Sequence, residues 1–325
     1  MTKRPLYLML LISTLVLVGL NGLMGSLTRR LPYHIKLESI RNAGDSNVLF
    51  VGNSLLDGHL NESAMTASAA RRGLSIHPLN AALGGSEPPE QRLLFHYAAK
   101  IHGGISTLVV GFYDFQLTAP DLTHAEDLKG NRMVGVDHRF SAQEVVEAYG
   151  FGAEDQAKLV LERLSPMVAN RASAWRQVEL MRRSLAQAGM PTVATNSMGR
   201  AADFAALEAG SAQVFDAKAS AFLANPSSFN LSFEAIFREA QDRKMKVVLV
   251  AMPMSPTHWN AYYSRPLWAR YQSAIETLAA ARGIRFIDAS DWMHSQSDFA
   301  DHLHMAPEVI DGFSERLGSE LVRTR

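Results

Sequence analysis

The strongest hydrophobic pattern is an uninterrupted apolar run near the amino terminus. Residues 6–27 carry no charged side chain, and basic residues flank the run on both sides. At about 1.5 Å of rise per residue, a helix of this length can span a bilayer core of roughly 30 Å. A cleaved signal peptide has a shorter apolar core and a small-residue exit, and a buried core helix rarely runs this far with so few polar side chains. We therefore predict a signal anchor or transmembrane helix over residues 1–30 and a juxtamembrane linker over residues 31–46.

Beyond this segment, short apolar runs alternate with amphipathic stretches. The runs are continuous, which suits parallel strands that are buried on both faces. The stretches between them place apolar residues at helical spacing, as at Tyr271, Ile275 and Leu278. This alternation predicts an α/β fold with a doubly wound, mostly parallel five-stranded sheet flanked by helices. The expected strands are residues 48–52, 75–80, 107–111, 247–252 and 284–287.

The stretch from about residue 118 to about residue 228 breaks this alternation. Its pattern is mostly helical, with Val178, Met181 and Leu185 on one face. Its last part is rich in alanine. We predict a helical insertion here, between the third and fourth strands of a catalytic domain that covers residues 47–325.

Composition narrows the classes of function. The 325 residues are 47% hydrophobic and 20% charged, with a formal net charge of zero, as in ordinary globular proteins. No run or stripe rich in lysine and arginine occurs, so we expect no nucleic-acid partner. The chain has no cysteine, which excludes disulfides, thiolate metal sites, a cysteine nucleophile and a lipid-modified cysteine.

Two separated motifs carry candidate chemistry. Residues 52–58 read Gly-Asn-Ser-Leu-Leu-Asp-Gly and follow the first predicted strand, whereas residues 301–304 read Asp-His-Leu-His. A serine is a weak nucleophile until a base takes its proton, and the base needs a carboxylate to orient it. Sites in parallel sheets form at the carboxyl ends of strands, where Ser54 falls. We predict Ser54 as the nucleophile, His304 as general base and then general acid, and Asp301 as the carboxylate that orients His304.

Other interpretations of these residues stay open. A serine after a strand is usually a helix cap or a turn residue. His302 is the rival to His304 as the base. The aromatic stretch 258–268, after the fourth strand, has the character of a loop that either lines a substrate pocket or packs on the surface. A late cluster also has the residue types of a metal site, namely His294, Asp298, Asp301, His302 and His304. A metal site would leave the serine motif unexplained, so we expect no metal and no cofactor.

The chain resembles the SGNH (GDSL-type) hydrolases at both ends of the predicted domain. Residues 52–58 are similar to the first sequence block of that family, Gly-Asp-Ser-Leu-x-Asp-Gly, with Asn53 in place of aspartate. Residues 301–304 are similar to its last block, Asp-x-x-His. The resemblance covers residues 47–114 and 245–318 and leaves out the anchor and the insertion. It implies a flavodoxin-like SGNH fold that works through an acyl-enzyme without a cofactor.

The resemblance also implies an oxyanion hole. Residues 80–85 are similar to the second block, whose glycine offers a backbone N–H to the oxyanion; Gly85 aligns best with it and Gly84 next. The third block is Gly-x-Asn-Asp, but here Tyr113 stands where the family has its amide donor. Loss of one oxyanion donor costs about 10²–10³ in rate, and a tyrosine hydroxyl reaches further than an amide. The expected hole combines the N–H groups of Ser54 and Gly85 with Tyr113, and the expected substrate pocket includes Asp57, Gly84, Asp114 and His302.

These features predict a single-pass, membrane-anchored serine esterase or O-acyltransferase whose domain lies outside the cytoplasm. Lys3 and Arg4 favour an amino terminus inside the cell. Anchored members of the superfamily that the chain resembles include transferases and esterases acting on exported glycans. This resemblance implies that the substrate is an O-acyl or O-acetyl ester of a polysaccharide or envelope glycan, in the periplasm or at the cell surface. Two alternatives stay open: a non-catalytic SGNH-fold envelope or assembly protein, which Tyr113 favours, and a lipid esterase. Envelope-assembly proteins are further candidate partners.

Overall fold

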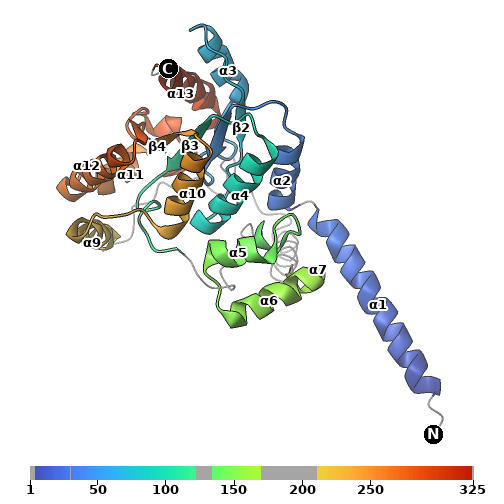
Figure 1. The fold of residues 1–325 in the computed structure, drawn as a ribbon. Coiled ribbons are helices and arrows are strands. Elements are labelled where there is room, and N and C mark those ends of the chain that lie inside the picture. Colours follow the sequence, from blue (N-terminus) through green and yellow to red (C-terminus); the bar gives the residue numbers. More distant parts are fainter. Residues whose placement is uncertain (1–3, 30, 122–133, 170–210, 324–325) are drawn as a thin grey trace, which may run out of the picture. The chain divides into compact units, whose positions relative to one another are not determined.

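The structure of the chain is a computed structural model that describes residues 4–29, 31–121, 134–169 and 211–323 (Figure 1). The chain divides into two compact units. The first combines residues 1–39 with residues 122–190, and the second combines residues 40–121 with residues 191–325. Both sequence motifs with candidate chemistry lie in the second unit. The predicted domain boundaries stay predictions.

The second unit is built on a five-stranded parallel sheet, which confirms the predicted fold class. Its strands run in the order β2-β1-β3-β4-β5, a flavodoxin-like arrangement with its switch point between β1 and β3. Every residue of β1 and β3 is buried, as continuous apolar runs predict. The strands are β1 (Val48–Val51), β2 (Pro78–Asn80), β3 (Thr107–Phe112), β4 (Lys246–Ala251) and β5 (Arg285–Asp288).

Helices pack on this sheet and on one another in pairs. α4 packs against α10, α13 against α3, and α12 against α9. The α3–α13 pair is close, because a Cβ at Gly318 would lie only 2.8 Å from the Met65 side chain. The longer helices are α3 (Glu62–Ala70), α4 (Pro88–Ile101), α9 (Ser211–Ala224), α10 (Leu231–Asp242), α12 (Pro266–Ala281) and α13 (Ile310–Val322). The short ones are α11 (Pro256–His258), η3 (Trp259–Tyr263), η4 (Gln296–Asp298) and η5 (Pro307–Val309).

The first unit is helical in its described part. It contains α1 (Arg4–Thr28), α5 (Ala142–Tyr149), α6 (Ala153–Leu164) and α7 (Pro166–Ala169), and α2 (Pro32–Asn42) crosses the boundary between the units. Over Tyr7–Ser26, α1 is long and apolar enough to cross a membrane, a property that a signal sequence shares. The segment predicted as a juxtamembrane linker is largely the helix α2, in which Leu37 and Ile40 are fully buried.

The described part of the predicted insertion is mostly helical, because α5, α6, α7 and α9 fall between residues 118 and 228. Ser141 begins α5 with a capping box, in which its hydroxyl accepts a hydrogen bond from the Glu144 N–H and the Glu144 side chain accepts one from the Ser141 N–H. The helical face predicted at Val178, Met181 and Leu185 lies outside the described residues.

Candidate active site

Ser54 sits on a tight turn directly after β1. The Asn53 carbonyl accepts hydrogen bonds from the N–H groups of Leu56 and Asp57, at 3.1 and 2.9 Å. The Asn53 side chain accepts another from the Leu55 N–H, at 3.0 Å. The Asn53 side chain therefore makes the hydrogen bond to the backbone that closes this turn. The family that the chain resembles has aspartate at this position. The turn directs the segment across the end of the sheet, next to β3, since a Cβ at Gly52 would lie 3.0 Å from the Gly111 carbonyl.

The late motif brings His304 against Ser54. The His304 Nε2 and the Ser54 Oγ are 2.9 Å apart. The other ring nitrogen, Nδ1, lies 2.9 and 3.0 Å from the two carboxylate oxygens of Asp301. Both His304 and Asp301 are only 8% exposed. With Nδ1–H donating to the carboxylate, Nε2 is left as the acceptor for the serine hydroxyl proton.

The Asp301 carboxylate is held in its charged form. Burial by itself would raise the pKa of Asp301, but hydrogen bonds from the His304 ring and from the N–H groups of His304 and Leu303 hold it well below its usual range. The two backbone bonds both go to Oδ1, at 2.8 and 2.9 Å. The Asp-x-x-His spacing thus folds into a tight loop in which one carboxylate orients both the backbone and the ring.

His302, the rival base, does not meet Ser54 in this arrangement. Its backbone carbonyl accepts a hydrogen bond from the Ser255 hydroxyl at 2.8 Å, which ties the late loop to the segment after β4. Its ring stacks on that of His258, with centroids 6.3 Å apart. The geometry therefore favours His304 over His302 as the partner of Ser54.

Two backbone N–H groups beside the serine have no hydrogen-bond partner within the described chain. They belong to Ser54 and Gly85. Gly85 has φ of +73°, a conformation that L side chains rarely adopt. The neighbouring Gly84 N–H instead donates to the Asp57 carboxylate at 2.8 Å. Of the two glycines named as candidates, Gly85 is the one whose N–H remains available, and Asp57 braces the glycine loop.

The sequence interpretation missed His59, which follows the serine motif directly. The ring is 5% exposed, and its Nδ1 lies 2.8 Å from the Ser54 carbonyl and 3.2 Å from the Asp57 carbonyl. Burial lowers the pKa of His59, and hydrogen bonds to these carbonyls offset this effect only in part. A neutral ring that donates from Nδ1 would fix the backbone of the turn that carries Ser54. In the sequence, only the position of His59 directly after the serine motif could have pointed to this role.

A second polar network surrounds Asp114 at the end of β3. Its Oδ1 accepts hydrogen bonds from the Tyr263 hydroxyl and from the His258 Nε2, both at 2.9 Å. Its N–H donates to the Tyr263 oxygen at 2.9 Å. The π-helix η3 makes this double contact feasible, because its Ser264-to-Trp259 hydrogen bond spans five residues and brings positions 258 and 263 to one side. Asp114 has φ of 46°, a backbone conformation that this network holds in place.

Tyr113, beside Asp114, keeps its proton. Burial, then the charges of Asp114 and Glu87, raise the pKa of Tyr113 to about 12. Its hydroxyl has no hydrogen-bond partner within the described chain. It is thus a phenol donor at the end of β3, on the strand next to the one that Ser54 follows.

The aromatic stretch after β4 is helical and mostly buried, so its interpretation as a loop was wrong. It forms α11, η3 and the start of α12, and Tyr262, Tyr263 and Trp268 are each at most 8% exposed. Trp268 stacks on Tyr263 with centroids 4.0 Å apart, and Tyr262 stacks on Phe215 of α9 at 4.5 Å. These rings form a packed aromatic layer, which contacts Asp114 through the Tyr263 hydroxyl.

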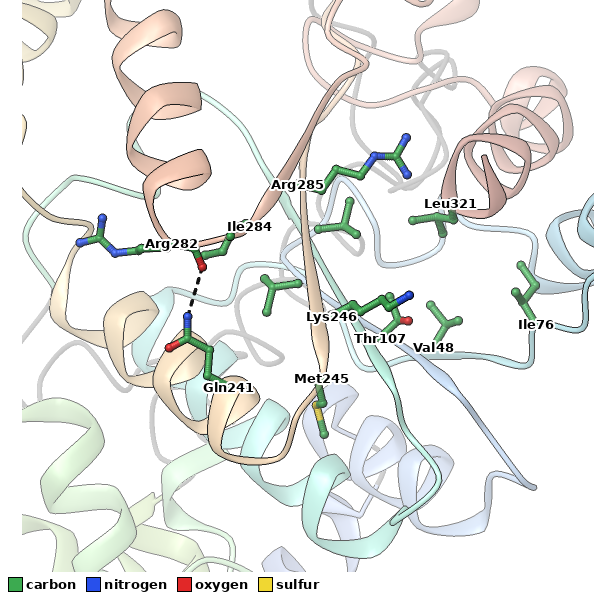
Figure 2. A pocket seen from close by; sticks show the side chains of 13 residues that line it. Val48, Ile76, Thr107, Gln241, Met245, Lys246, Arg282, Ile284, Arg285 and Leu321 are labelled. Atoms are coloured by element: carbon green, nitrogen blue, oxygen red, sulfur yellow. Dashed lines mark hydrogen bonds between the residues drawn. The ribbon is translucent and has the colours of Figure 1, made fainter. Parts of the chain in front are cut away.

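A hollow of about 390 Å³ lies at the other end of the sheet (Figure 2). It is lined by the first residues of β1, β3, β4 and β5, which are Val48, Thr107, Lys246 and Arg285. Ser54 follows the carboxyl end of β1, so this hollow is separate from the serine site. Among the described residues, no three His, Asp or Glu side chains form a group that could hold a metal ion.

No protein-family model matches the sequence, and no curated protein matches it. Solved structures with a similar fold include a lipase/acylhydrolase from Enterococcus faecalis, which is 11% identical over 85% of this chain and 95% of that chain, with a TM-score of 0.39. A GDSL-like lipase from Bacteroides thetaiotaomicron is 10% identical over 89% and 98%, with a TM-score of 0.38. A candidate acylhydrolase from Bacteroides fragilis is 10% identical over 88% and 95%, with a TM-score of 0.39. Likeness at this level does not establish a shared function, so function must be inferred from the geometry of the site.

Proposed function

We propose that the chain is a serine esterase or O-acyltransferase of the SGNH type that works through an acyl-enzyme. The observation that supports this most directly is the hydrogen-bonded series from Ser54 through His304 to Asp301, with 2.9 Å at each step. These distances lie within the range for proton transfer between a nucleophile and its base. The series has the order of nucleophile, base and orienting carboxylate.

The proposed reaction has two steps. The Ser54 Oγ attacks the ester carbonyl carbon while the His304 Nε2 takes the hydroxyl proton. The tetrahedral oxyanion accepts hydrogen bonds from the N–H groups of Ser54 and Gly85, and His304 then gives its proton to the departing alkoxide oxygen. Water or a sugar hydroxyl, deprotonated by His304, then attacks the acyl carbonyl carbon; the bond between that carbon and the Ser54 Oγ breaks, and His304 returns the proton to the Ser54 oxygen. Asp301 stabilises the imidazolium in both steps.

Fluorophosphonate labelling tests the proposal, because this reagent bonds its phosphorus to an activated serine oxygen and loses fluoride. We expect the wild-type chain to be labelled and Ser54→Ala to remain unlabelled. The matched control is Ser228→Ala, which removes an exposed hydroxyl in the loop before α10 and should label like the wild type. If a folded wild-type sample takes no label and cleaves no ester, the proposed catalysis is wrong, and the non-catalytic envelope role is favoured instead.

The Tyr113 hydroxyl is the proposed third oxyanion donor. Tyr113→Phe should lower kcat for an aryl acetate by about 10², with little change in KM, because such a donor acts mainly in the transition state. Tyr113→Asn restores a shorter amide donor and should hydrolyse faster than the wild type if the long reach of tyrosine limits the rate. Tyr262→Phe removes a hydroxyl from the aromatic layer and serves as the control. An unchanged kcat in Tyr113→Phe would remove Tyr113 from the oxyanion hole.

The favoured substrate is an O-acyl group, such as O-acetyl, on an envelope glycan outside the cytoplasm. α1 supports this location, because a retained span would hold the site near the outer face of a membrane. Ser54, Gly84 and Tyr113 are only half-buried beyond the carboxyl ends of the strands, which suits a bulky polymer better than a single lipid chain. If the chain is a transferase, an added glycan acceptor should raise acyl turnover while free acid stays low. A reporter active only in the cytoplasm, fused after Arg325, should be silent; its activity would overturn the location.

A further inference from the structure

The Asp114 carboxylate at the end of β3 has one oxygen that its own network does not use. Its Oδ1 accepts both side-chain hydrogen bonds, from the Tyr263 hydroxyl and from the His258 Nε2. Its Oδ2 accepts none within the described chain, and the side chain is 26% exposed. A carboxylate oxygen that is accessible and carries negative charge is a strong acceptor for the hydroxyl groups of a ligand.

The position of this carboxylate is set by buried groups. Tyr263 and His258 are 5% and 3% exposed, and the Tyr263 oxygen also accepts the Asp114 N–H at 2.9 Å. Asp114 is held at φ of 46°, a backbone conformation that costs free energy outside glycine. A side chain that is fixed in this way loses little conformational freedom when a ligand binds, so less of its hydrogen-bond energy is offset.

The segment that carries Asp114 lies beside the turn that carries Ser54. β1 and β3 are neighbouring parallel strands, and the two residues follow the carboxyl ends of these strands. The Asn53 Nδ2 lies 3.5 Å from the Gln116 Oε1, so the residue before Ser54 meets a residue shortly after Asp114. Neighbouring strands are only about 4.8 Å apart, so an ester bonded to Ser54 can extend past the end of β3.

The late loop contributes a second polar side chain to the same surroundings. His302 is half-buried, and its ring nitrogens have no hydrogen-bond partner within the described chain. Its ring is parallel to that of His258, which holds Asp114 through Nε2. The His302 carbonyl is fixed by the Ser255 hydroxyl at 2.8 Å. An imidazole ring offers an N–H donor to a ligand oxygen, which complements the acceptor on Asp114.

We propose that Asp114 and His302 form a subsite that binds hydroxyl groups of the sugar to which the acyl group is attached. The Asp114 Oδ2 accepts a hydrogen bond from one hydroxyl, and the His302 ring donates one to another. A hydrocarbon leaving group offers neither partner, so the subsite selects a sugar ester over a lipid ester. The inference rests on the proposed function and deepens it, because it names the residues that choose the substrate.

Two acetates with a six-membered ring test the subsite in the full chain. Methyl 6-O-acetylglucoside carries three ring hydroxyls, whereas cyclohexylmethyl acetate carries none. We expect the wild-type kcat/KM to be about 10–100-fold higher for the sugar acetate, because a hydrogen bond to a charged group contributes an effect of this size. Equal values, or a preference for cyclohexylmethyl acetate, would overturn the subsite while the serine chemistry stands.

Asp114→Asn separates binding from the structural role of this residue. The amide oxygen can keep the contacts of Oδ1 with Tyr263 and His258, and asparagine tolerates the positive φ, but a neutral NH2 group replaces Oδ2. The preference for the sugar acetate should fall about tenfold, since hydrogen bonds of a charged group are stronger than neutral ones. The matched control is Asp242→Asn at the exposed end of α10, which should keep the wild-type preference. An equal loss for both acetates in Asp114→Asn would mean that Asp114 only holds its loop, which overturns the subsite.

His302→Ala tests the other half of the subsite and should also lower the preference about tenfold. His294→Ala, which removes an exposed ring, is its control. If the wild-type chain takes the fluorophosphonate label but cleaves neither acetate, the sugar subsite is wrong and the activated serine stands. If it takes no label and cleaves no ester, the proposed function itself fails.

Discussion

Ester turnover should fall by about 10⁴–10⁶ when Ser54 is replaced by alanine, with the fold unchanged. The Ser54 side chain is half-buried, and its one hydrogen bond in the described chain is the 2.9 Å contact with His304. Removing it deletes the proposed nucleophile but leaves the N–H groups of residue 54 and Gly85 in place, so a residual rate above that of water should remain. The measurement is kcat for an aryl acetate, with the thermal unfolding midpoint recorded for the same samples.

A double variant separates the loss of chemistry from structural damage. Groups that act as one unit are strongly non-additive, so Ser54→Ala combined with His304→Ala should be hardly slower than either single variant. If the losses multiply instead, the two residues do not act in one proton transfer, and the proposed acyl-enzyme is wrong.

The fold could be predicted because its signals are local. The buried parallel strands read as continuous apolar runs, and β1, β3, β4 and β5 occur where these runs predict them. β2 was predicted over residues 75–80 and pairs only over Pro78–Asn80, since one neighbour, β1, sets its length. The Ser54, Asp301 and His304 juxtaposition was also accessible, because a motif after a strand and a motif on a late loop meet at one end of such a sheet.

The rest of the site depends on tertiary contacts that no pattern encodes. Asp57 belongs to the serine motif and His59 follows it, but only the fold brings Asp57 to the Gly84 N–H and the His59 ring to the Ser54 carbonyl. The pairing of Asp114 with His258 and Tyr263 needs a π-helix, whose wider turn has no hydrophobic period of its own.

Exposure of an amphipathic helix is equally hidden from the sequence. The apolar residues of α6 have the spacing of a core-facing side, yet Leu161 and Leu164 are exposed while Leu159 is buried. Which side of a helix is buried depends on the neighbouring elements, so the spacing alone does not tell which apolar residues of a helix lie in the core.

Asp301→Asn should lower kcat by about 10⁴ while leaving substrate affinity nearly unchanged. The Asp301 Oδ1 accepts the N–H groups of both Leu303 and His304, so the oxygen of an asparagine must take that place. Its amide nitrogen then stands at the Oδ2 position, 2.9 Å from the His304 Nδ1, and donates a hydrogen bond to it. Nδ1 becomes an acceptor, the ring proton moves to Nε2, and Nε2 can no longer take the proton of Ser54. The measurement is kcat and KM for the same aryl acetate; turnover close to that of the wild type would mean that Asp301 does not orient the base.

The same variant should also change the dependence of stability on acid. Because the pKa of Asp301 is lower in the folded chain than in the unfolded one, its charge stabilises the fold above the unfolded value of about 3.9. That contribution is lost as the pH falls from about 4 through the lower folded value. Asparagine does not titrate, so the free energy of unfolding of Asp301→Asn should fall less steeply than that of the wild type below pH of about 4. The measurement is the free energy of unfolding, from urea unfolding at each pH across this range. If it falls with pH equally steeply in the wild type and in Asp301→Asn, the hydrogen bonds of the loop do not stabilise the charged form of Asp301.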